Sequence, residues 1–250
     1  MTPAATAVDD PARRAELAAN LARLRARIAA AAATAGRDTG EITLIAVTKT
    51  YPGADVVHLA DLGVREIGEN RDQEAAAKAA EVAAAGAAVR WHFVGRLQRN
   101  KCRSVVAYAD LVHSVDSVRL AAALAEAAAA RRDRPLDVLV QVSLDADPAR
   151  GGALPEPGAE PDRWLPRVAE AVAGGAALRL RGLMAVAPLG DPPVAAFARL
   201  AAIAERVRAD HPEAVILSAG MSDDLEAALD HGATHLRIGA ALLGKRAPLR

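Results

Sequence analysis

The sequence predicts an α/β fold: a closed (β/α)8 TIM barrel of eight parallel strands, preceded by one extra N-terminal helix. Eight short, β-branched apolar runs follow one another along the chain, and alanine-rich stretches with helical periodicity separate most of them. Strands that alternate with helices pair in parallel, and near-continuous apolar strands indicate that both faces of the sheet are covered. Eight such units in about 215 residues favour the closed barrel. The alternative is an open doubly wound sheet, but no G-x-G-x-x-G motif follows the first strand.

The expected elements follow in chain order. The extra helix covers about residues 10–35, because Pro11 suits a first helical turn and Gly36 ends a run of regularly spaced leucines. Strands are expected near 42–47, 64–67, 91–94, 111–115, 137–143, 180–184, 214–217 and 235–238. Helices are expected near 53–62, 71–85, 98–108, 117–131, 162–173, 193–209 and 222–231. Residues 146–162, rich in proline, glycine and glutamate, are expected to form an exposed, mobile excursion.

Composition restricts the class of protein. Of the 250 residues, 52% are hydrophobic and 25% are charged, with a net charge of zero, which argues against a nucleic-acid binder with a broad basic face. No apolar run is long enough to span a bilayer, and the start lacks the features of a secretory signal. The single cysteine, Cys102, excludes an internal disulfide, and the histidines show no metal-ligand spacing. We therefore expect a cytoplasmic protein with one domain over 1–250, of which 1–40 is an extension containing the extra helix.

Lys49 is the first candidate functional residue. It follows the first predicted strand directly and precedes a Tyr51-Pro52-Gly53 turn, so it lies at the carboxyl end of that strand, where barrels place their chemistry. Apolar neighbours are expected to leave its amine partly desolvated and nucleophilic, able to form a Schiff base with a carbonyl group. Taken alone, the pattern also fits a lysine whose ammonium reaches solvent or joins an ion pair.

Two glycine turns near the end of the chain indicate an anion site. Residues 218–224 link the seventh strand to a helix, and Gly239 follows the eighth strand. The loops after these strands commonly bind phosphate in barrels, because helix starts expose amide groups, and Arg237 offers a bidentate cation. A capping box of Asp223 with Glu226 is expected. The acidic pair Asp223-Asp224 weighs slightly against phosphate unless its side chains point away. Ordinary capping glycines and an ion-paired arginine are the alternative.

Two further segments carry polar side chains near the same rim. Asn70, at the end of the second strand, is expected either to point into the mouth beside Lys49 or to cap the next helix. Residues 96–101 are strongly basic and could contact RNA or an acidic partner, although the neutral overall charge favours a local salt-bridged surface. His92, within the third strand, is expected to be a hydrogen-bonded core residue.

A Schiff-base lysine and a phosphate clamp together define a ligand with a carbonyl group at one end and a phosphate at the other. Pyridoxal 5′-phosphate fits, and so does a phosphorylated sugar in an aldolase. At this point the chain resembles the pyridoxal phosphate homeostasis protein family, which is related to the N-terminal domain of alanine racemases. The shared motifs, in order, are AVTK (46–49), GEN (68–70), QE (73–74), HFVGRLQRNK (92–101), HSVDS (113–117), RGLM (181–184), LSAGMS (217–222) and RIG (237–239).

The resemblance implies that six residues hold pyridoxal 5′-phosphate. Lys49 would carry the cofactor as an internal aldimine, and Asn70 matches a pocket position. The phosphate would be held by Ser222, Arg237 and the backbone of Met221 and Gly239. The family's usual hydroxyl residue is replaced by Ala240, which removes one possible phosphate contact.

The resemblance also bears on activity. Alanine racemases add a second domain that supplies a tyrosine base, and neither Tyr51 nor Tyr108 matches it. We therefore expect a non-enzymatic carrier in intracellular vitamin B6 homeostasis, passing its cofactor to apo-enzymes that depend on pyridoxal phosphate. We expect a monomer or weak dimer, with no nucleic-acid or membrane partner. The alternatives are an amino-acid racemase with an unrecognised base, a Schiff-base aldolase acting through Lys49, and an RNA- or protein-binding module using residues 96–101.

Overall fold

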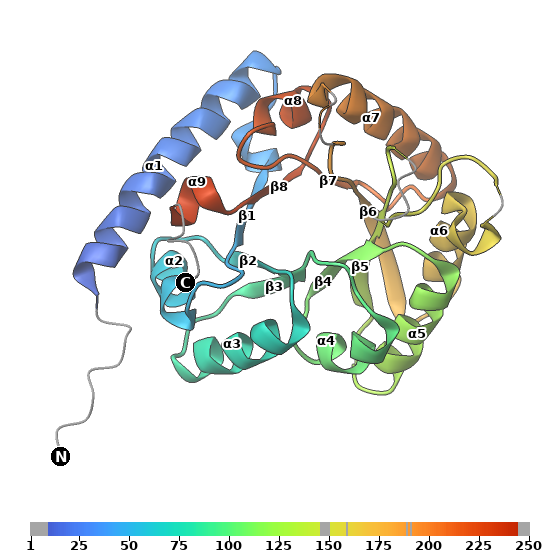
Figure 1. Cartoon of the computed structure of the whole chain (residues 1–250), viewed down its shortest axis with the longest axis horizontal. Helices are drawn as coiled ribbons and strands as arrows, with labels where there is room; N and C mark the ends of the chain where they lie inside the picture. Colours follow the sequence, from blue (N-terminus) through green and yellow to red (C-terminus); the bar gives the residue numbers. More distant parts are fainter. Residues whose placement is uncertain (1–9, 146–150, 159, 189, 191, 245–250) are drawn as a thin grey trace.

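The computed structural model describes residues 10–145, 151–158, 160–188, 190 and 192–244. Eight parallel strands pair in chain order, and the last pairs back to the first, so the barrel is closed. Helices surround it on all sides (Figure 1). The predicted barrel is confirmed. In the described part of the chain, no helix is both long and apolar enough to cross a membrane.

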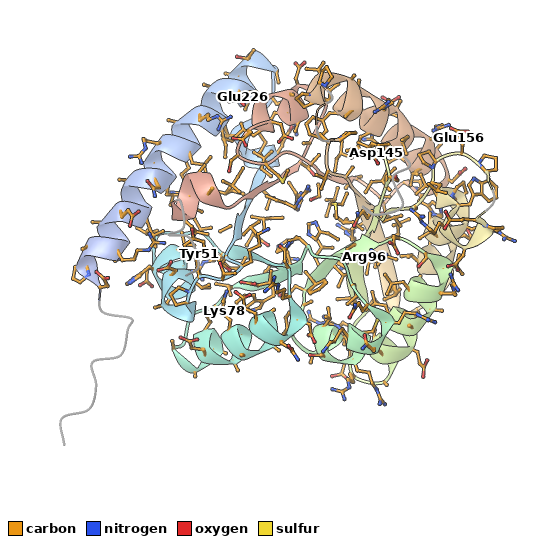
Figure 2. All side chains as sticks on the ribbon, viewed as in Figure 1. Tyr51, Lys78, Arg96, Asp145, Glu156 and Glu226 are labelled. Carbon is orange, nitrogen blue, oxygen red and sulfur yellow. The ribbon has the colours of Figure 1, made fainter. Side chains whose placement is uncertain are left out.

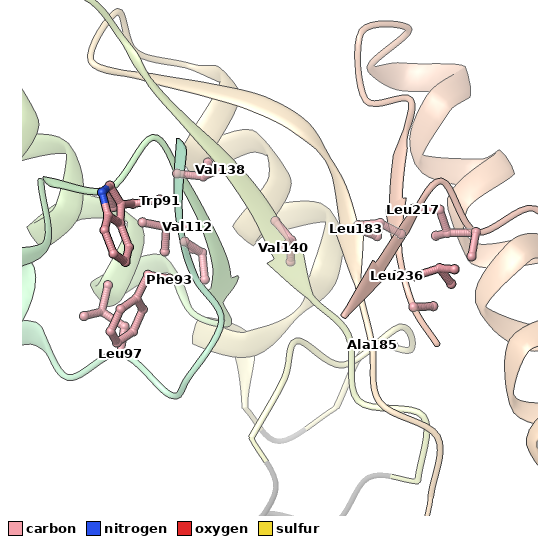
Figure 3. Packing of buried hydrophobic residues seen from close by; sticks show 14 of the residues in the cluster. Trp91, Phe93, Leu97, Val112, Val138, Val140, Leu183, Ala185, Leu217 and Leu236 are labelled. Atoms are coloured by element: carbon pink, nitrogen blue, oxygen red, sulfur yellow. The ribbon is translucent and has the colours of Figure 1, made fainter. Parts of the chain in front are cut away.

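Each observed strand lies within about two residues of its predicted range, the usual uncertainty of element ends. The strands are β1 Thr43–Val47, β2 Glu66–Glu69, β3 Arg90–Phe93, β4 Leu111–Val115, β5 Leu136–Gln141, β6 Leu178–Met184, β7 Ile216–Ser218 and β8 His235–Ile238. Figure 3 shows valines of β4 and β5 beside leucines of β6, β7 and β8 in the buried core. Side chains are buried on both faces of the sheet, as the continuous apolar runs predicted.

The helices also follow the prediction, with two differences. They are α1 Pro11–Thr34, α2 Gly53–Asp61, α3 Asp72–Ala84, α4 Cys102–Tyr108, α5 Val118–Ala129, α6 Leu165–Ala173, α7 Pro193–Asp210, α8 Leu225–Asp230 and α9 Ala240–Leu243. The helix expected from residue 98 begins as a 3-10 turn, Arg99–Lys101, and becomes α-helical only afterwards. The helix expected from residue 222 begins three residues later, because 222–224 form a turn.

Helix α1 packs against the outside of the barrel. Its N-cap is Asp10, whose side chain accepts from Arg13 N at 3.0 Å. The apolar positions at helical spacing, among them Leu17, Leu21 and Leu24, form its buried face. Figure 1 shows the helix along the side of the molecule formed by α8, α9 and α2. The predicted extra helix is therefore part of the core packing.

The predicted exposed excursion is wrong for residues 151–153, whereas residues 156–158, 160 and 161 are exposed as predicted. Residues 151–153 are buried, and Ala153 N donates to Gln141 O at 2.6 Å, so this segment pairs beside the end of β5. Gly152 has φ +104°, and a Cβ there would lie 2.6 Å from Ser143 N, so glycine is what permits the approach. Residues 146–150 and 159 lie outside the described residues.

Candidate functional site

The carboxyl ends of the strands meet at one rim of the barrel, and the predicted site residues lie on one arc of it. Strand β1 pairs with β2 on one side and with β8 on the other, and β8 pairs with β7. The arc β2–β1–β8–β7 therefore brings together the loops that follow these four strands (Figure 1). Asn70, Lys49, Gly239 and Ser222 stand in those four loops in that order. Residues scattered over more than 170 positions of sequence thus become neighbours on the rim.

Lys49 lies on the rim, but in a turn rather than at the strand end. Strand β1 stops at Val47, Thr48 is fully buried, and Lys49 and Thr50 form an exposed turn. Thr50 has φ +65°, the only positive φ outside glycine among the described residues. The expectation of a partly desolvated amine is wrong for this conformation, because the chain leaves the apolar strand before it reaches the lysine. Strained backbone of this kind is enriched at functional sites.

A buried ionic cluster lies directly under this turn. Lys78 Nζ, from α3, donates to Thr48 O at 2.8 Å and to Glu69 Oε1 at 2.6 Å. Thr48 Oγ1 donates to the same carboxylate oxygen at 2.7 Å. Burial raises the pKa of Glu69, against the opposing effect of the hydrogen bonds from Lys78 and Thr48. No sequence motif pointed to this cluster, although Lys78 is one of only four lysines in the chain.

Asn70 does not cap the helix that follows it. The N-cap of α3 is Arg71, which makes no side-chain capping bond. Asn70 Oδ1 is buried and has no hydrogen-bond partner among the residues that the structure describes. A Cβ at Gly95 would lie 2.1 Å from Asn70 O, so glycine there allows the loop after β3 to press against Asn70. A buried acceptor without a donor is a place where a ligand donor fits, and this favours the ring-binding alternative.

The turn after β7 presents its amide to an acid. Met221 N donates to Asp224 Oδ1 at 2.6 Å. The predicted capping box is wrong: the N-cap of α8 is Asp224, and Glu226 instead pairs with Arg27 of α1 at 2.5 Å. The reason is the turn at 222–224, which moves Asp223 out of the capping position. The acidic side chain therefore does not point away, and its carboxylate occupies an amide that was expected to bind phosphate.

The turns after β7 and β8 are in contact, as predicted for a shared anion site. Ser222 Oγ accepts from Ala241 N, in the first turn of α9, at 3.4 Å. At the other end of α9, Tyr51 from the loop after β1 donates its hydroxyl to Gly244 O at 2.8 Å. The lysine loop and the two glycine turns are thus joined through α9 and its flanking residues.

Arg237 points into the barrel instead of into the loop. Only 6% of it is exposed, and it donates to Ser218 Oγ at 2.7 Å and to Ala185 O at 2.9 Å. Burial lowers its pKa to about 10, and the charge of Asp224 opposes that shift. Its guanidinium remains a cation near the turns at neutral pH. A direct phosphate contact by this residue stays a prediction.

A chain of hydrogen bonds continues from Ser218 across the barrel interior. Ser218 Oγ lies 3.0 Å from His113 Nδ1, His113 Nε2 lies 2.9 Å from His92 Nδ1, and His92 Nε2 lies 2.5 Å from Glu66 Oε2. Because an arginine can only donate and a carboxylate can only accept, every link is satisfied when each group donates toward Glu66. Both histidines are then neutral with the proton on Nε2. The predicted core role of His92 is confirmed.

The pKa values of this chain follow from its burial. Burial lowers the pKa of His113 well below its usual value, and the nearby positive groups add to the effect. For Glu66, burial raises the pKa, but the hydrogen bond from His92 and the surrounding positive charge outweigh it, so the net shift is downward. The interior therefore favours a neutral imidazole at His113, which is linked through His92 to the carboxylate of Glu66.

Helix α1 holds the two glycine turns from outside. Arg27 Nη1 donates to Ser222 O at 2.6 Å. Asn20 Nδ2 donates to Leu242 O at 2.9 Å, and Arg13 Nη2 donates to Leu243 O at 3.0 Å. These polar side chains lie on a helix whose sequence pattern indicates only an apolar face, so their role has no local signal. Among the described residues, no group of three His, Cys, Asp or Glu side chains could hold a metal ion.

Three comparisons place this geometry among known proteins. The family model described as "Alanine racemase, N-terminal domain" matches residues 19–247. The pyridoxal phosphate homeostasis protein of Mycobacterium tuberculosis is 48% identical, over 94% of this chain and 95% of that protein. A solved protein from Bifidobacterium adolescentis, described as unknown, has a TM-score of 0.83 and 32% identity over 93% of this chain and 96% of its own. PipY of Synechococcus elongatus, solved with PLP bound, has a TM-score of 0.73 and 34% identity over 91% and 100%.

Proposed function

This chain belongs to the family of the alanine racemase N-terminal domain, and on that premise we propose that it binds pyridoxal 5′-phosphate and serves vitamin B6 homeostasis as a non-enzymatic carrier. The name of the mycobacterial relative and the PLP bound in PipY support the ligand. The observation that carries the proposal is the arc of the rim on which Lys49, Asn70 and the two joined glycine turns meet.

The residues of the arc fit such a ligand. When bound, pyridoxal 5′-phosphate supplies an aldehyde that reacts reversibly with an amine, and Lys49 supplies that amine. Asn70 Oδ1 is buried without a hydrogen-bond donor, so it can accept a hydrogen bond from a polar group of the ring. The amide of Met221 already holds a carboxylate, which is an anion in the place proposed for phosphate.

The remaining residues complete the phosphate end of the site. The hydroxyl of Ser222 and the backbone at Gly239 belong to the two turns that touch through Ala241 N. Arg237 adds a cation that burial has not neutralised at pH 7. We assign the phosphate to Ser222, Arg237 and the backbone of Met221 and Gly239. In this arrangement the ligand lies across the arc, with its aldehyde toward β1 and its phosphate toward β7 and β8.

Exchange, rather than catalysis, suits these residues. Lys49 is exposed, so an amine from outside can reach the bond that it forms. The Tyr51 hydroxyl is engaged with Gly244 O, and Tyr108 lines a hollow between α3 and α4 on the outside of the barrel. The relatives are named for homeostasis of the cofactor and not for a reaction. We propose apo-enzymes that require pyridoxal phosphate as recipients, in the cytoplasm, with the carrier a monomer or weak dimer.

The first experiment asks whether Lys49 carries the ligand. Purified protein is loaded with pyridoxal 5′-phosphate, its visible absorption is recorded, and borohydride is added before mass analysis of the peptides. We expect a peptide containing Lys49 to gain the mass of the ligand less one oxygen atom, because condensation releases water and reduction adds two hydrogens. Lys49→Ala should abolish the band and the adduct. Lys101→Ala, which removes a partly exposed lysine elsewhere, should change neither.

A second experiment separates carrier from enzyme. Loaded protein is incubated with L-alanine or L-serine, and in parallel with the apo form of an aminotransferase. We expect recovery of aminotransferase activity and no change in the stereochemistry of the amino acid. Racemisation would replace the carrier proposal with the racemase alternative, and a Lys49 that reacts only with a sugar phosphate would favour the aldolase.

A further inference from the structure

We propose that Lys78 is a positioning residue for Lys49. With Glu69 and Glu74 it holds the residues on both sides of Lys49, and so it aims the reactive amine along the rim. This inference rests on the function proposed above, and it assigns to α3 a role in ligand capture that involves no contact with the ligand.

The residue before Lys49 is held through its backbone and its side chain. Thr48 O accepts from Lys78 Nζ at 2.8 Å, and Thr48 Oγ1 donates to Glu69 Oε1 at 2.7 Å. Lys78 Nζ and Glu69 Oε1 are themselves 2.6 Å apart. These three groups form a closed triangle of hydrogen bonds. Rotation of the Thr48 side chain breaks the bond to Glu69, and rotation of its carbonyl group breaks the bond from Lys78.

The residue after Lys49 is held by the same helix. Thr50 N donates to Glu74 Oε1, and that oxygen lies 3.3 Å from Lys78 Nζ. Thr50 has φ +65°, a conformation that a β-branched residue adopts only when its surroundings impose it. The bond to Glu74 is such a constraint. Lys49 is therefore the single residue between two tethered neighbours, and the direction of its side chain follows from theirs.

The chemistry of the cluster matches an ammonium specifically. An ammonium has three donors, and Lys78 Nζ has three acceptors within 3.3 Å, on Thr48, Glu69 and Glu74. Lys78 is 5% exposed and the side chain of Glu69 is fully buried, so both charges have left water. Burying an ion pair often gains no stability over an apolar pair of the same size. Positioning of the turn formed by Lys49 and Thr50 is therefore a functional reason for this pair. Figure 2 shows Lys78 on the side of α3 that faces the strands.

The test compares two ligands that share a ring and a phosphate. Pyridoxal 5′-phosphate can bond to Lys49, whereas pyridoxine 5′-phosphate carries an alcohol in place of the aldehyde and cannot. The variant is Lys78→Met/Glu69→Gln, which removes both charges together and leaves no lone carboxylate buried. We expect its rate of borohydride-trapped capture of pyridoxal 5′-phosphate to fall between about tenfold and a hundredfold, with the affinity for pyridoxine 5′-phosphate unchanged.

A matched control uses the other lysine–carboxylate pair of the same region. Lys101→Met/Asp72→Asn also removes one cation and one buried acid, 3.9 Å apart, but no contact to the lysine turn. We expect it to capture both ligands like the unmodified protein. Should the first double variant not fold, Glu74→Ala frees Thr50 N and removes the most distant of the three acceptors of Lys78 Nζ, and it is expected to slow capture in the same selective way.

Two results would overturn the inference. One is an equal loss for both ligands, which would mean that the cluster merely supports the fold. The other is capture at the normal rate in the folded variants. Failure of the proposed function looks different, because the unmodified protein itself would then form no trapped adduct at Lys49.

Discussion

The two sides of the rim are held in place by different physical means. On the lysine side, Lys78 and Glu69 form an ion pair whose side chains are 5% and 0% exposed. On the phosphate side, Arg27 and Glu226 form a pair whose side chains are 37% and 52% exposed, and α1 adds bonds to main-chain carbonyls. One side is therefore braced from within the packed interior, and the other from the surface.

The difference in burial predicts that the two sides respond differently to substitution. A buried pair has little solvent screening, and loss of one partner strands the other charge. An exposed pair is screened, and its loss costs the fold little. The lysine side is thus expected to be rigid and critical for stability, as suits a group that must form a covalent bond. On the phosphate side, a substitution is expected to change the stability of the fold only slightly but to change the affinity for the ligand.

The largest expected effect is that of Lys78→Met as a single variant. It leaves the carboxylate of Glu69 buried without its cation, so the free energy of unfolding should drop by about 3–5 kcal/mol. Denaturant titration followed by circular dichroism measures the drop. Lys78→Met/Glu69→Gln should restore most of it, because no charge is then left unpaired. If Lys78→Met were as stable as the parent, the stability of the lysine side would not depend on its buried ion pair.

The interior between the two sides should respond to pH. Burial lowers the pKa of His235 to about 4, and it also lowers that of His113. Below the unfolded value of about 6.5, the unfolded chain binds protons that the folded chain does not, so stability is present above pH 6.5 and is lost as the pH falls. For His235 the loss by pH 4 is on the order of 3 kcal/mol. Glu66, with its lowered pKa, adds a further loss below about pH 4.5.

Denaturant titrations at a series of pH values check this dependence. His235→Gln should flatten the curve between pH 6.5 and 4, because it removes one group that takes up a proton on unfolding. A parent protein whose stability is flat over this range would contradict a neutral, partly buried His235.

A smaller effect is expected from Arg27→Ala on the phosphate side. Stability should change by less than about 1 kcal/mol, because its ion pair is exposed. Affinity for pyridoxine 5′-phosphate should nevertheless fall, since the turn at Ser222 loses the bond to its carbonyl. Arg119→Ala breaks an exposed pair with Asp162 far from the turns and should alter neither quantity. If Arg27→Ala destabilised the protein as strongly as Lys78→Met, the proposed contrast between the sides would be wrong.

The smallest expected effect comes from Asp224→Asn. The asparagine can still accept from Met221 N but carries no charge beside the phosphate site. We expect the affinity for pyridoxine 5′-phosphate to rise at low ionic strength, and the gain to shrink as salt screens the interaction. Fluorescence titrations at two salt concentrations measure it. A lower affinity in the variant would place the phosphate away from Met221 N.

Several site features were predictable because their signals are local. The sequence alone shows a lysine directly after an apolar strand and glycines after the last two strands. The parallel order of the strands then predicts that these residues lie on one arc of the rim. The exposure of Lys49 was not predictable in this way. It depends on the strand ending at Val47, and that end is set by pairing with β2 and β8 rather than by any residue of β1 alone.

The sequence by itself determined that eight strands and their helices alternate and which loops carry chemistry, because apolar periodicity and turn glycines act over a few residues. Only the tertiary structure decided what holds those loops. The Arg27 bond to Ser222 spans 195 positions and the His113 contact with Ser218 spans 105, so neither has a local signal. Such partners meet only when the barrel closes, because closure brings β8 back to β1 and lays α1 against the last two turns.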